Sequence, residues 1–130
     1  MKICYVDSSV IVGILFCEKE SPAWIRYINS CDEVISANLT EAEVLSAATR
    51  ESISLDSAKS LLDAISLIQP DRTLRKEYER IFSSGYCRGA DAFHIACALY
   101  LDPEAKEIIF FTVDKQQEKV AKSVGFSTKN

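Results

Sequence analysis

The fold is decided by a short stretch near the N-terminus, residues 2–10, which reads KICYVDSSV. Its apolar residues form a run without polar alternation, which is typical of a parallel strand buried on both faces. The run ends on Asp7, and the chain then turns at once into a helix. Ligands of open α/β sheets gather at the carboxyl ends of such strands. Asp7 is therefore the first candidate functional residue.

The size and charge of the chain set limits on its function. The sequence has 130 residues, of which 48% are hydrophobic, and this supports one domain with its own core. We expect a single domain over residues 1–130. The 15 basic and 19 acidic residues give a net charge of −4, so no overall positive field points to a polyanionic partner. Nucleic acid binding would have to be local or assisted by a metal ion.

The cysteines and the apolar runs indicate where in the cell the protein is located. The five cysteines are odd in number, form no Cys-x-x-Cys pair and lie mostly in apolar runs, which is typical of buried thiols in a reducing environment. The apolar run at residues 10–17 is too short to cross a bilayer, and no small-residue cleavage site follows it. We expect a soluble, cytoplasmic protein without a membrane segment.

Strands and helices alternate along the rest of the chain. Besides the first strand, we expect strands at residues 34–36, 65–68, 107–112 and 126–128. The helices are predicted at residues 10–16, 22–29, 41–50, 55–64, 72–82, 92–101 and 115–124, with Ser21, Thr40 and Asp71 among the caps. This alternation predicts an α/β fold whose parallel sheet has helices on both faces. The carboxyl ends of all strands would then share one edge.

Two acidic residues stand where this topology would bring them to that edge, and two more candidates lie near helix starts. Asp7 and Asp114 follow strands and precede helices, whereas Glu43 and Asp91 lie near helix starts. Each could instead serve a helix start, as a cap or through the helix dipole. Asp114, with Gln117 three residues later, and Thr40-x-x-Glu43 both have capping-box spacing. Converging carboxylates repel one another unless a divalent cation holds them. An oxygen-only set without His or Cys suits Mg²⁺ or Mn²⁺ rather than zinc.

Four short segments resemble the PIN-domain ribonucleases, the family that includes the VapC toxins of toxin-antitoxin pairs. These segments are YVDSSVI at 5–11, LTEAEVL at 39–45, GADAFHIA at 89–96 and FTVD at 111–114. Their order and spacing over nearly the whole chain carry the resemblance. It implies a three-layer α/β/α domain with a central, mostly parallel sheet of four to five strands.

The resemblance also implies a site and a reaction. It places the four family acids, as catalytic residues and metal ligands, on Asp7, Glu43, Asp91 and Asp114. These would hold one or two Mg²⁺ or Mn²⁺ ions that activate a water to cut an RNA phosphodiester, leaving a 5′-phosphate and a 3′-hydroxyl. VapC-like proteins pair with a small antitoxin and often dimerise, so the resemblance implies a cognate antitoxin and a homodimer.

Residues beside the four acids are candidates for supporting or alternative roles. Ser8, beside the first acid, and Thr112, in the Thr-x-Asp element, would support the ligands if the resemblance holds. Helical spacing aligns Glu41, rather than Glu43, with Val44 and the apolar face of its helix, so Glu41 stays the alternative ligand.

Two basic residues near Asp91 are candidates for an accessory role in the reaction. Arg88 could contact a phosphate, although a solvated arginine is the simpler interpretation. His94, the one histidine in the sequence, is better explained as a packed or hydrogen-bonded residue than as a general base.

Two other functions remain open at this point. A Mg²⁺-dependent phosphatase would need an Asp-x-Asp pair, but Ser9 stands two residues after Asp7, and the acids fit a phospho-accepting receiver poorly. The chain could also be a non-catalytic binding module with a PIN fold. The presence of all four acids weighs against a module of that kind, since a pure scaffold would not need them.

Overall fold

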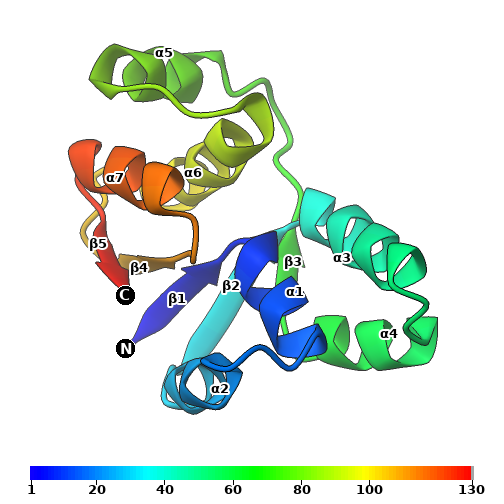
Figure 1. Ribbon diagram of the computed structural model, residues 1–130. Helices are drawn as coiled ribbons and strands as arrows, with labels where there is room; N and C mark the ends of the chain where they lie inside the picture. The colour runs from blue at the N-terminus through cyan, green and yellow to red at the C-terminus, as the bar shows by residue number, and fades with distance from the viewer. Residues whose placement is uncertain (130) are drawn as a thin grey trace.

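A parallel sheet forms the centre of the molecule. The computed structural model describes residues 1–129, and in these residues it shows a sheet of five strands in the order β3-β2-β1-β4-β5, all parallel (Figure 1). The strands are β1 (Ile3–Val6), β2 (Glu33–Ala37), β3 (Ser66–Ile68), β4 (Ile108–Phe111) and β5 (Ser127–Lys129). The first strand is central, because β1 pairs with both β2 and β4.

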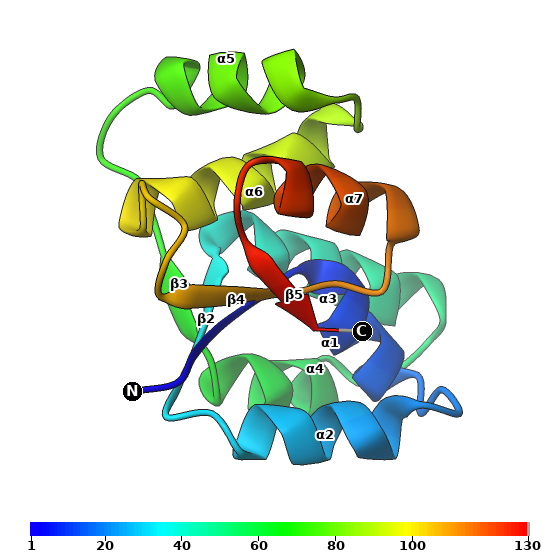
Figure 2. The same ribbon diagram turned by 90° about the vertical axis from the view of Figure 1, so that its left-hand side faces the viewer.

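Helices cover both faces of this sheet. One face carries α1 (Ser8–Leu15), α2 (Ser21–Asn29), α3 (Asn38–Arg50) and α4 (Leu55–Asp63). The other carries α5 (Arg75–Ser84), α6 (Gly89–Leu101) and α7 (Lys115–Ser123). Figure 2 shows the two layers above and below the strands. The predicted three-layer α/β/α fold with a parallel sheet is therefore confirmed.

The side chains of β1 join both halves of the core. Cys4 and Val6 are fully buried against the α1 layer, whereas Tyr5, equally buried, packs with the α6 layer. The Tyr5 ring stacks on Phe110 of β4, with ring centroids 5.3 Å apart. A strand covered on both faces must be apolar throughout, which is the pattern that the sequence showed.

Most predicted elements lie within a few residues of the observed ones, but three expected caps were wrong. α2 already includes Ser21, and its cap position is Glu20. α3 begins at Asn38, directly after β2, so Thr40 lies within its first turn with its hydroxyl 2.6 Å from that of Ser36. The helix expected after Asp71 begins instead at Arg75. Asp71 accepts a 2.7 Å hydrogen bond from the hydroxyl of Tyr100.

The helix cap that the sequence allowed at Asp114 is present in the structure. Its Oδ1 accepts a hydrogen bond of 2.9 Å from the backbone N–H of Gln117, and such a cap stabilises a helix by about 1 kcal/mol. The bond fixes the turn from β4 into α7. Across residues 1–129, none of the helices has the length and apolar character needed to cross a membrane.

Candidate metal centre

The four predicted acids meet in one cavity at the carboxyl edge of the sheet. Asp7 follows β1, and Asp114 lies just beyond the neighbouring strand β4. Glu43 comes from α3 and Asp91 from the first turn of α6. The cavity has a volume of about 300 Å³, and its lining comprises Asp7, Ser8, Ser9, Glu43, Arg88, Ala90, Asp91 and Asp114. The βα connections therefore bring together side chains that are up to 107 positions apart in the sequence.

Helix capping does not explain Asp7. It occupies the cap position of α1, but among the described residues its side chain makes no capping hydrogen bond to that helix. Only 3% of the residue is exposed, and its Oδ1 accepts a 2.7 Å hydrogen bond from the hydroxyl of Ser9. Burial raises the pKa of Asp7 to about 6, although the hydrogen bond from Ser9 acts in the opposite direction. A cation beside it would stabilise the ionised form of a buried carboxyl of this kind.

Ser9 and Thr112 connect the first acid to the fourth. The Ser9 hydroxyl accepts a hydrogen bond from the backbone N–H of Val113 at 3.2 Å and lies 3.3 Å from the Thr112 hydroxyl. The Thr112 hydroxyl accepts a 3.0 Å hydrogen bond from the backbone N–H of Asp114. Ser9 therefore holds the carboxylate of Asp7, a role that we expected for Ser8, and both serines line the cavity.

Gln117 also belongs to this network, although its spacing from Asp114 predicted only a capping role. Its side chain is fully buried, and its Oε1 accepts a 2.6 Å hydrogen bond from the Thr112 hydroxyl. Its Nε2 donates to the backbone oxygen of Asp91 at 3.2 Å. Gln117 thus joins the turn after β4 to the start of α6. The capping-box spacing marked the residue, but not the side-chain bonds.

His94 orients the second acid. Its ring is 1% exposed, with Nε2 2.8 Å from Oε1 of Glu43 and Nδ1 2.8 Å from the hydroxyl of Tyr5. Because a carboxylate can only accept, Nε2 carries the proton of the first bond, and Nδ1 of a neutral ring then accepts from Tyr5. This arrangement agrees with the sequence-based interpretation of His94 as a hydrogen-bonded residue. Glu43 lines the cavity, whereas Glu41 is exposed on α3.

Arg88 lies at the mouth of the cavity between two acids. Its side chain is 76% exposed, and its Nε is 3.3 Å from Oδ2 of Asp91. A second guanidinium nitrogen lies 3.7 Å from Oδ2 of Asp114. The hydrogen bond to Asp91 raises the pKa of Arg88. The arginine therefore offsets part of the negative charge that the converging acids create.

The donor chemistry of the cavity suits a hard divalent cation. Four carboxylates and two hydroxyls provide oxygen ligands, which Mg²⁺ and Mn²⁺ prefer. As the side chains stand, no three or more His, Cys, Asp or Glu within residues 1–129 have the spacing of a metal site. Asp91 and Asp114 are turned toward Arg88, and Glu43 toward His94. Binding of a cation would require the exposed guanidinium to give way, and Glu43 can use its second oxygen.

Comparisons with known proteins agree with the fold. The structure is similar to VapBC-1 from nontypeable Haemophilus influenzae, with 12% sequence identity, a TM-score of 0.72, and coverage of 98% of this chain and 97% of that chain. It is also similar to VapBC2 from Rickettsia felis bound to a DNA fragment from their promoter, with 11% identity, a TM-score of 0.68 and coverage of 98% of each chain. A comparison with curated proteins found no match. The sequence matches the PIN domain over residues 4–123, so the chain belongs to the PIN domain family.

Proposed function

We propose that this protein is a Mg²⁺- or Mn²⁺-dependent endoribonuclease that cuts RNA at the acidic cavity. The observation that carries the proposal is the convergence of four carboxylates from four separate elements on one cavity. Packing these charges together is unfavourable without a cation, and helix capping does not require it. PIN domain membership supports a nuclease, because the segments that carry the resemblance are those of the PIN-domain ribonucleases.

The residues of the chain have distinct tasks in this reaction. Asp7, Glu43, Asp91 and Asp114 would hold one or two cations, and Ser9 and Thr112 would keep the first and fourth acids in place. A bound divalent cation would lower the pKa of a water molecule and offset the charge of the scissile phosphate. The burial of Asp7 excludes competing water from its carboxylate, which strengthens its interaction with a cation.

Arg88 is suited to contact the phosphate. Its guanidinium lies at the cavity mouth, and its present partners, Asp91 and Asp114, are the acids that a cation would engage. Once a cation engages these acids, the guanidinium can turn to the phosphate and donate two parallel hydrogen bonds to two of its oxygens. Arg88 would then help to hold the RNA backbone against the acids.

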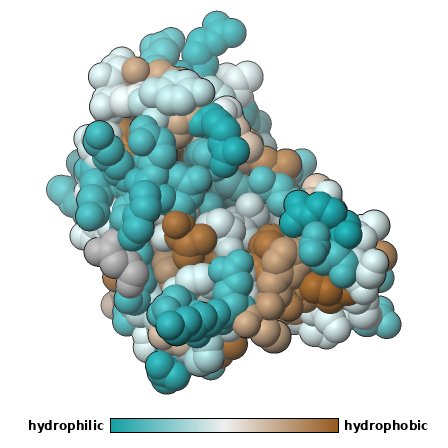
Figure 3. Space-filling view, viewed as in Figure 1, coloured by the Kyte–Doolittle hydropathy of each residue, from teal (hydrophilic) through white to brown (hydrophobic). Residues whose placement is uncertain are grey.

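We further propose that the protein is the toxin of a toxin-antitoxin pair, with a small cognate antitoxin, and that it forms a homodimer. The similarity to the two VapBC structures supports a partner of this kind. Apolar side chains are available on the α1 layer, since Ile25 of α2 and Leu55 of α4 are 41% and 45% exposed. Figure 3 shows apolar patches in the lower half of the view, whereas the upper half is mainly hydrophilic.

A cleavage assay with paired variants tests the proposed activity. The purified protein should cut RNA with Mg²⁺ or Mn²⁺ and lose the activity with EDTA. Asp7→Asn and Glu43→Gln should reduce kcat/KM by about 100-fold or more, because each removes a ligand charge. Glu41→Gln, an exposed change on the same helix, is the matched control and should stay within about twofold of the parent. Cleavage that persists in Asp7→Asn would contradict the proposal.

The same variants separate the other two functions. A phosphatase or receiver would act on a phosphomonoester or accept a phosphoryl group, but the position two residues after Asp7, where an Asp-x-Asp enzyme has its second acid, is Ser9. A non-catalytic module would bind no more Mn²⁺ than a variant lacking all four acids, which calorimetry can measure.

A further inference from the structure

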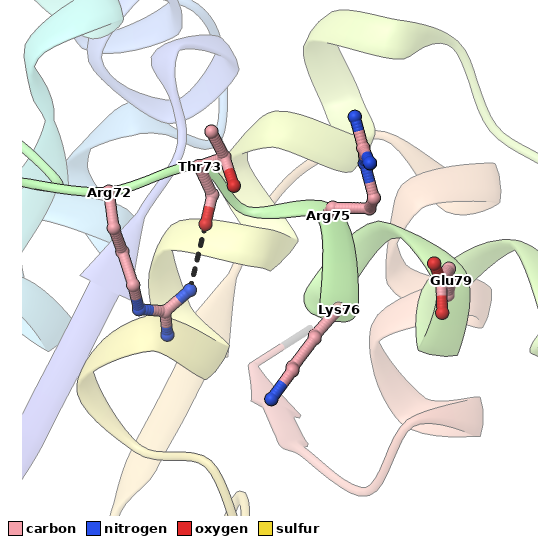
Figure 4. Close-up of a pocket in the computed structure, with 5 residues that line it drawn as sticks. All are labelled: Arg72, Thr73, Arg75, Lys76 and Glu79. Carbon is pink, nitrogen blue, oxygen red and sulfur yellow. Dashed lines mark hydrogen bonds between the residues drawn. The ribbon is translucent and has the colours of Figure 1, made fainter.

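A second, positively charged cavity lies at the start of α5. It is lined by Arg72, Thr73, Arg75, Lys76 and Glu79, has a volume of about 560 Å³, and is called the basic pocket below (Figure 4). Three cations within five residues stand out in a chain with a net charge of −4. Glu79 also lines the pocket and Glu77 pairs with Arg72, so the positive charge available to a polyanion comes mainly from Arg75 and Lys76.

One of these cations is fixed in place. The guanidinium of Arg72 donates to both carboxylate oxygens of Glu77, at 3.0 and 2.8 Å, and to the backbone oxygen of Thr73 at 2.9 Å. It also lies over the ring of Tyr100, 5.0 Å from the ring centroid. An arginine held from several sides loses little further freedom when it meets a ligand.

The other two cations are not held by a specific polar contact in the described part of the chain. Among the described residues, neither Arg75 nor Lys76 makes a hydrogen bond or an ion pair, and both are exposed. In Figure 4, Arg72 and Lys76 extend to the same side of the segment, while Arg75 points the other way. The cap position of α5 is Leu74, which provides no side-chain cap, so the partial positive charge of the helix start adds to the same field.

An intermediate cavity adjoins the basic pocket and reaches α3 and α6. It has a volume of about 390 Å³, shares Arg72 and Thr73 with the basic pocket, and also includes Asn38 of α3 and Phe93 of α6. These are the helices that contribute Glu43 and Asp91 to the acidic cavity. The ring of Phe93 is 6.0 Å from that of His94, which bonds Glu43. The intermediate cavity therefore adjoins the basic pocket, and α3 and α6 contribute residues to both the intermediate and the acidic cavity.

We propose that the basic pocket binds the phosphodiester backbone of the RNA substrate away from the cleaved bond, with the intermediate cavity receiving a base. This inference rests on the proposed ribonuclease function. Four carboxylates repel RNA wherever bound cations do not fully neutralise them, so positive charges outside the cavity would favour an extended contact with a single strand. The half-buried rings of Phe93 and Tyr78, which line the intermediate cavity, offer the stacking surfaces that single-stranded RNA uses.

A binding measurement tests the pocket independently of cleavage. Fluorescence anisotropy with a labelled, mixed-sequence single-stranded RNA of about 20 nucleotides would use the Asp7→Asn protein, in which no cutting is expected. Adding Arg75→Gln and Lys76→Gln should raise Kd about tenfold and lower the slope of log K against log salt by about 1.4. Lys19→Gln with Lys59→Gln, two exposed lysines elsewhere on the surface, is the control of equal charge and should change Kd by less than about twofold.

A cleavage measurement in the active protein then ties the pocket to the reaction. The Arg75→Gln and Lys76→Gln double variant should raise KM for the long RNA about tenfold and leave kcat within about twofold. A short RNA of about four nucleotides, which fills the acidic cavity alone, should be cut equally by the double variant and the parent protein.

The two proposals fail in different ways. If the double variant and the lysine control give the same Kd and the same salt slope, the basic pocket does not bind RNA, whether or not the protein is a nuclease. If RNA binds as expected but no metal restores cleavage, the ribonuclease proposal is wrong and the RNA contact stands. A loss of kcat with an unchanged KM would also overturn the pocket, because a remote contact acts on binding.

Discussion

His94 and Glu43 are joined at the edge of the sheet, with Nε2 of the imidazole 2.8 Å from Oε1 of the carboxylate. The ring is held from behind by the hydroxyl of Tyr5, which lies in the centre of the sheet. A proposed metal ligand on an exposed helix face is thereby fixed to the core of the protein. Hydrogen bonds of this kind orient a carboxylate and adjust its affinity for a metal.

Removal of the imidazole should weaken metal binding more than folding. His94→Phe keeps a ring in the buried space but frees Glu43, so we expect the Kd for Mn²⁺ to rise about 10- to 100-fold. Tyr5→Phe is the companion change, because it removes the hydroxyl and keeps the ring stacked on Phe110. Its effect should be smaller and in the same direction. Calorimetry with Mn²⁺ checks both, and unchanged affinity in a folded His94→Phe protein would show that the contact has no positioning role.

Substitution of Ser9 should weaken metal binding much more than substitution of Ser8. Ser9→Ala removes the hydrogen bond to Asp7 and an acceptor of the Val113 N–H, so about a tenfold loss of Mn²⁺ affinity is expected. The acid side of the pH profile should also move to higher pH, because that hydrogen bond favours the ionised form of Asp7. Ser8→Ala should stay within about twofold of the parent. Equal effects of the two changes would contradict this assignment.

Asp7 should make the metal-free protein less stable as the pH rises. Its pKa is raised from 3.8 to about 6 on folding, so the folded state holds a proton that the unfolded chain releases. The stabilising effect of that proton is present below pH 4, falls as the pH rises, and is lost above about 6.

Asp7→Asn should therefore stabilise the metal-free protein near pH 7, by at most about 3 kcal/mol, while it abolishes cleavage. Urea unfolding of both proteins at pH 5 and pH 7.5 with EDTA measures the difference, which should shrink at the lower pH. Mg²⁺ should stabilise the parent and not the variant. A variant that is less stable than the parent at both pH values would show that the buried carboxylate is not under strain from desolvation.

Arg88 should affect metal and RNA in opposite directions. Arg88→Gln removes the guanidinium that pairs with Asp91 and Asp114, so Mn²⁺ should bind equally well or up to about threefold more tightly. The KM for RNA should rise about tenfold, because a phosphate contact is lost. Weaker binding of Mn²⁺ would mean that the arginine organises the acids instead of competing with the cation.

The main features of the fold follow from local sequence patterns. The strands β1 and β4 are apolar runs that end close to an acid, and Asp114 has the capping spacing that the structure confirms. Because βα connections carry the chain to one edge, the meeting of Asp7 with Asp114 could be predicted from order alone. The places of Glu43 and Asp91 came from the resemblance to PIN domains.

The features that were missed depend on contacts between distant residues. The bond from Tyr5 to His94 joins residues 89 positions apart, and Asp71 is diverted from capping by Tyr100, 29 positions away. The choice between Ser8 and Ser9 depends on the rotation of the chain as it turns from β1 into α1. Neither spacing nor propensity carries such information, since both describe the chain only over a few residues.

The most direct test of the central claim is to locate Mn²⁺ by anomalous diffraction in crystals soaked at a pH well above 6, where Asp7 is ionised. A peak in the cavity in contact with Asp7 and with Asp91 or Asp114 is the predicted result, with the guanidinium of Arg88 turned away from its present partners. Mn²⁺ that binds elsewhere, or an absence of anomalous signal among the four carboxylates, would contradict the account of the cavity as a metal centre.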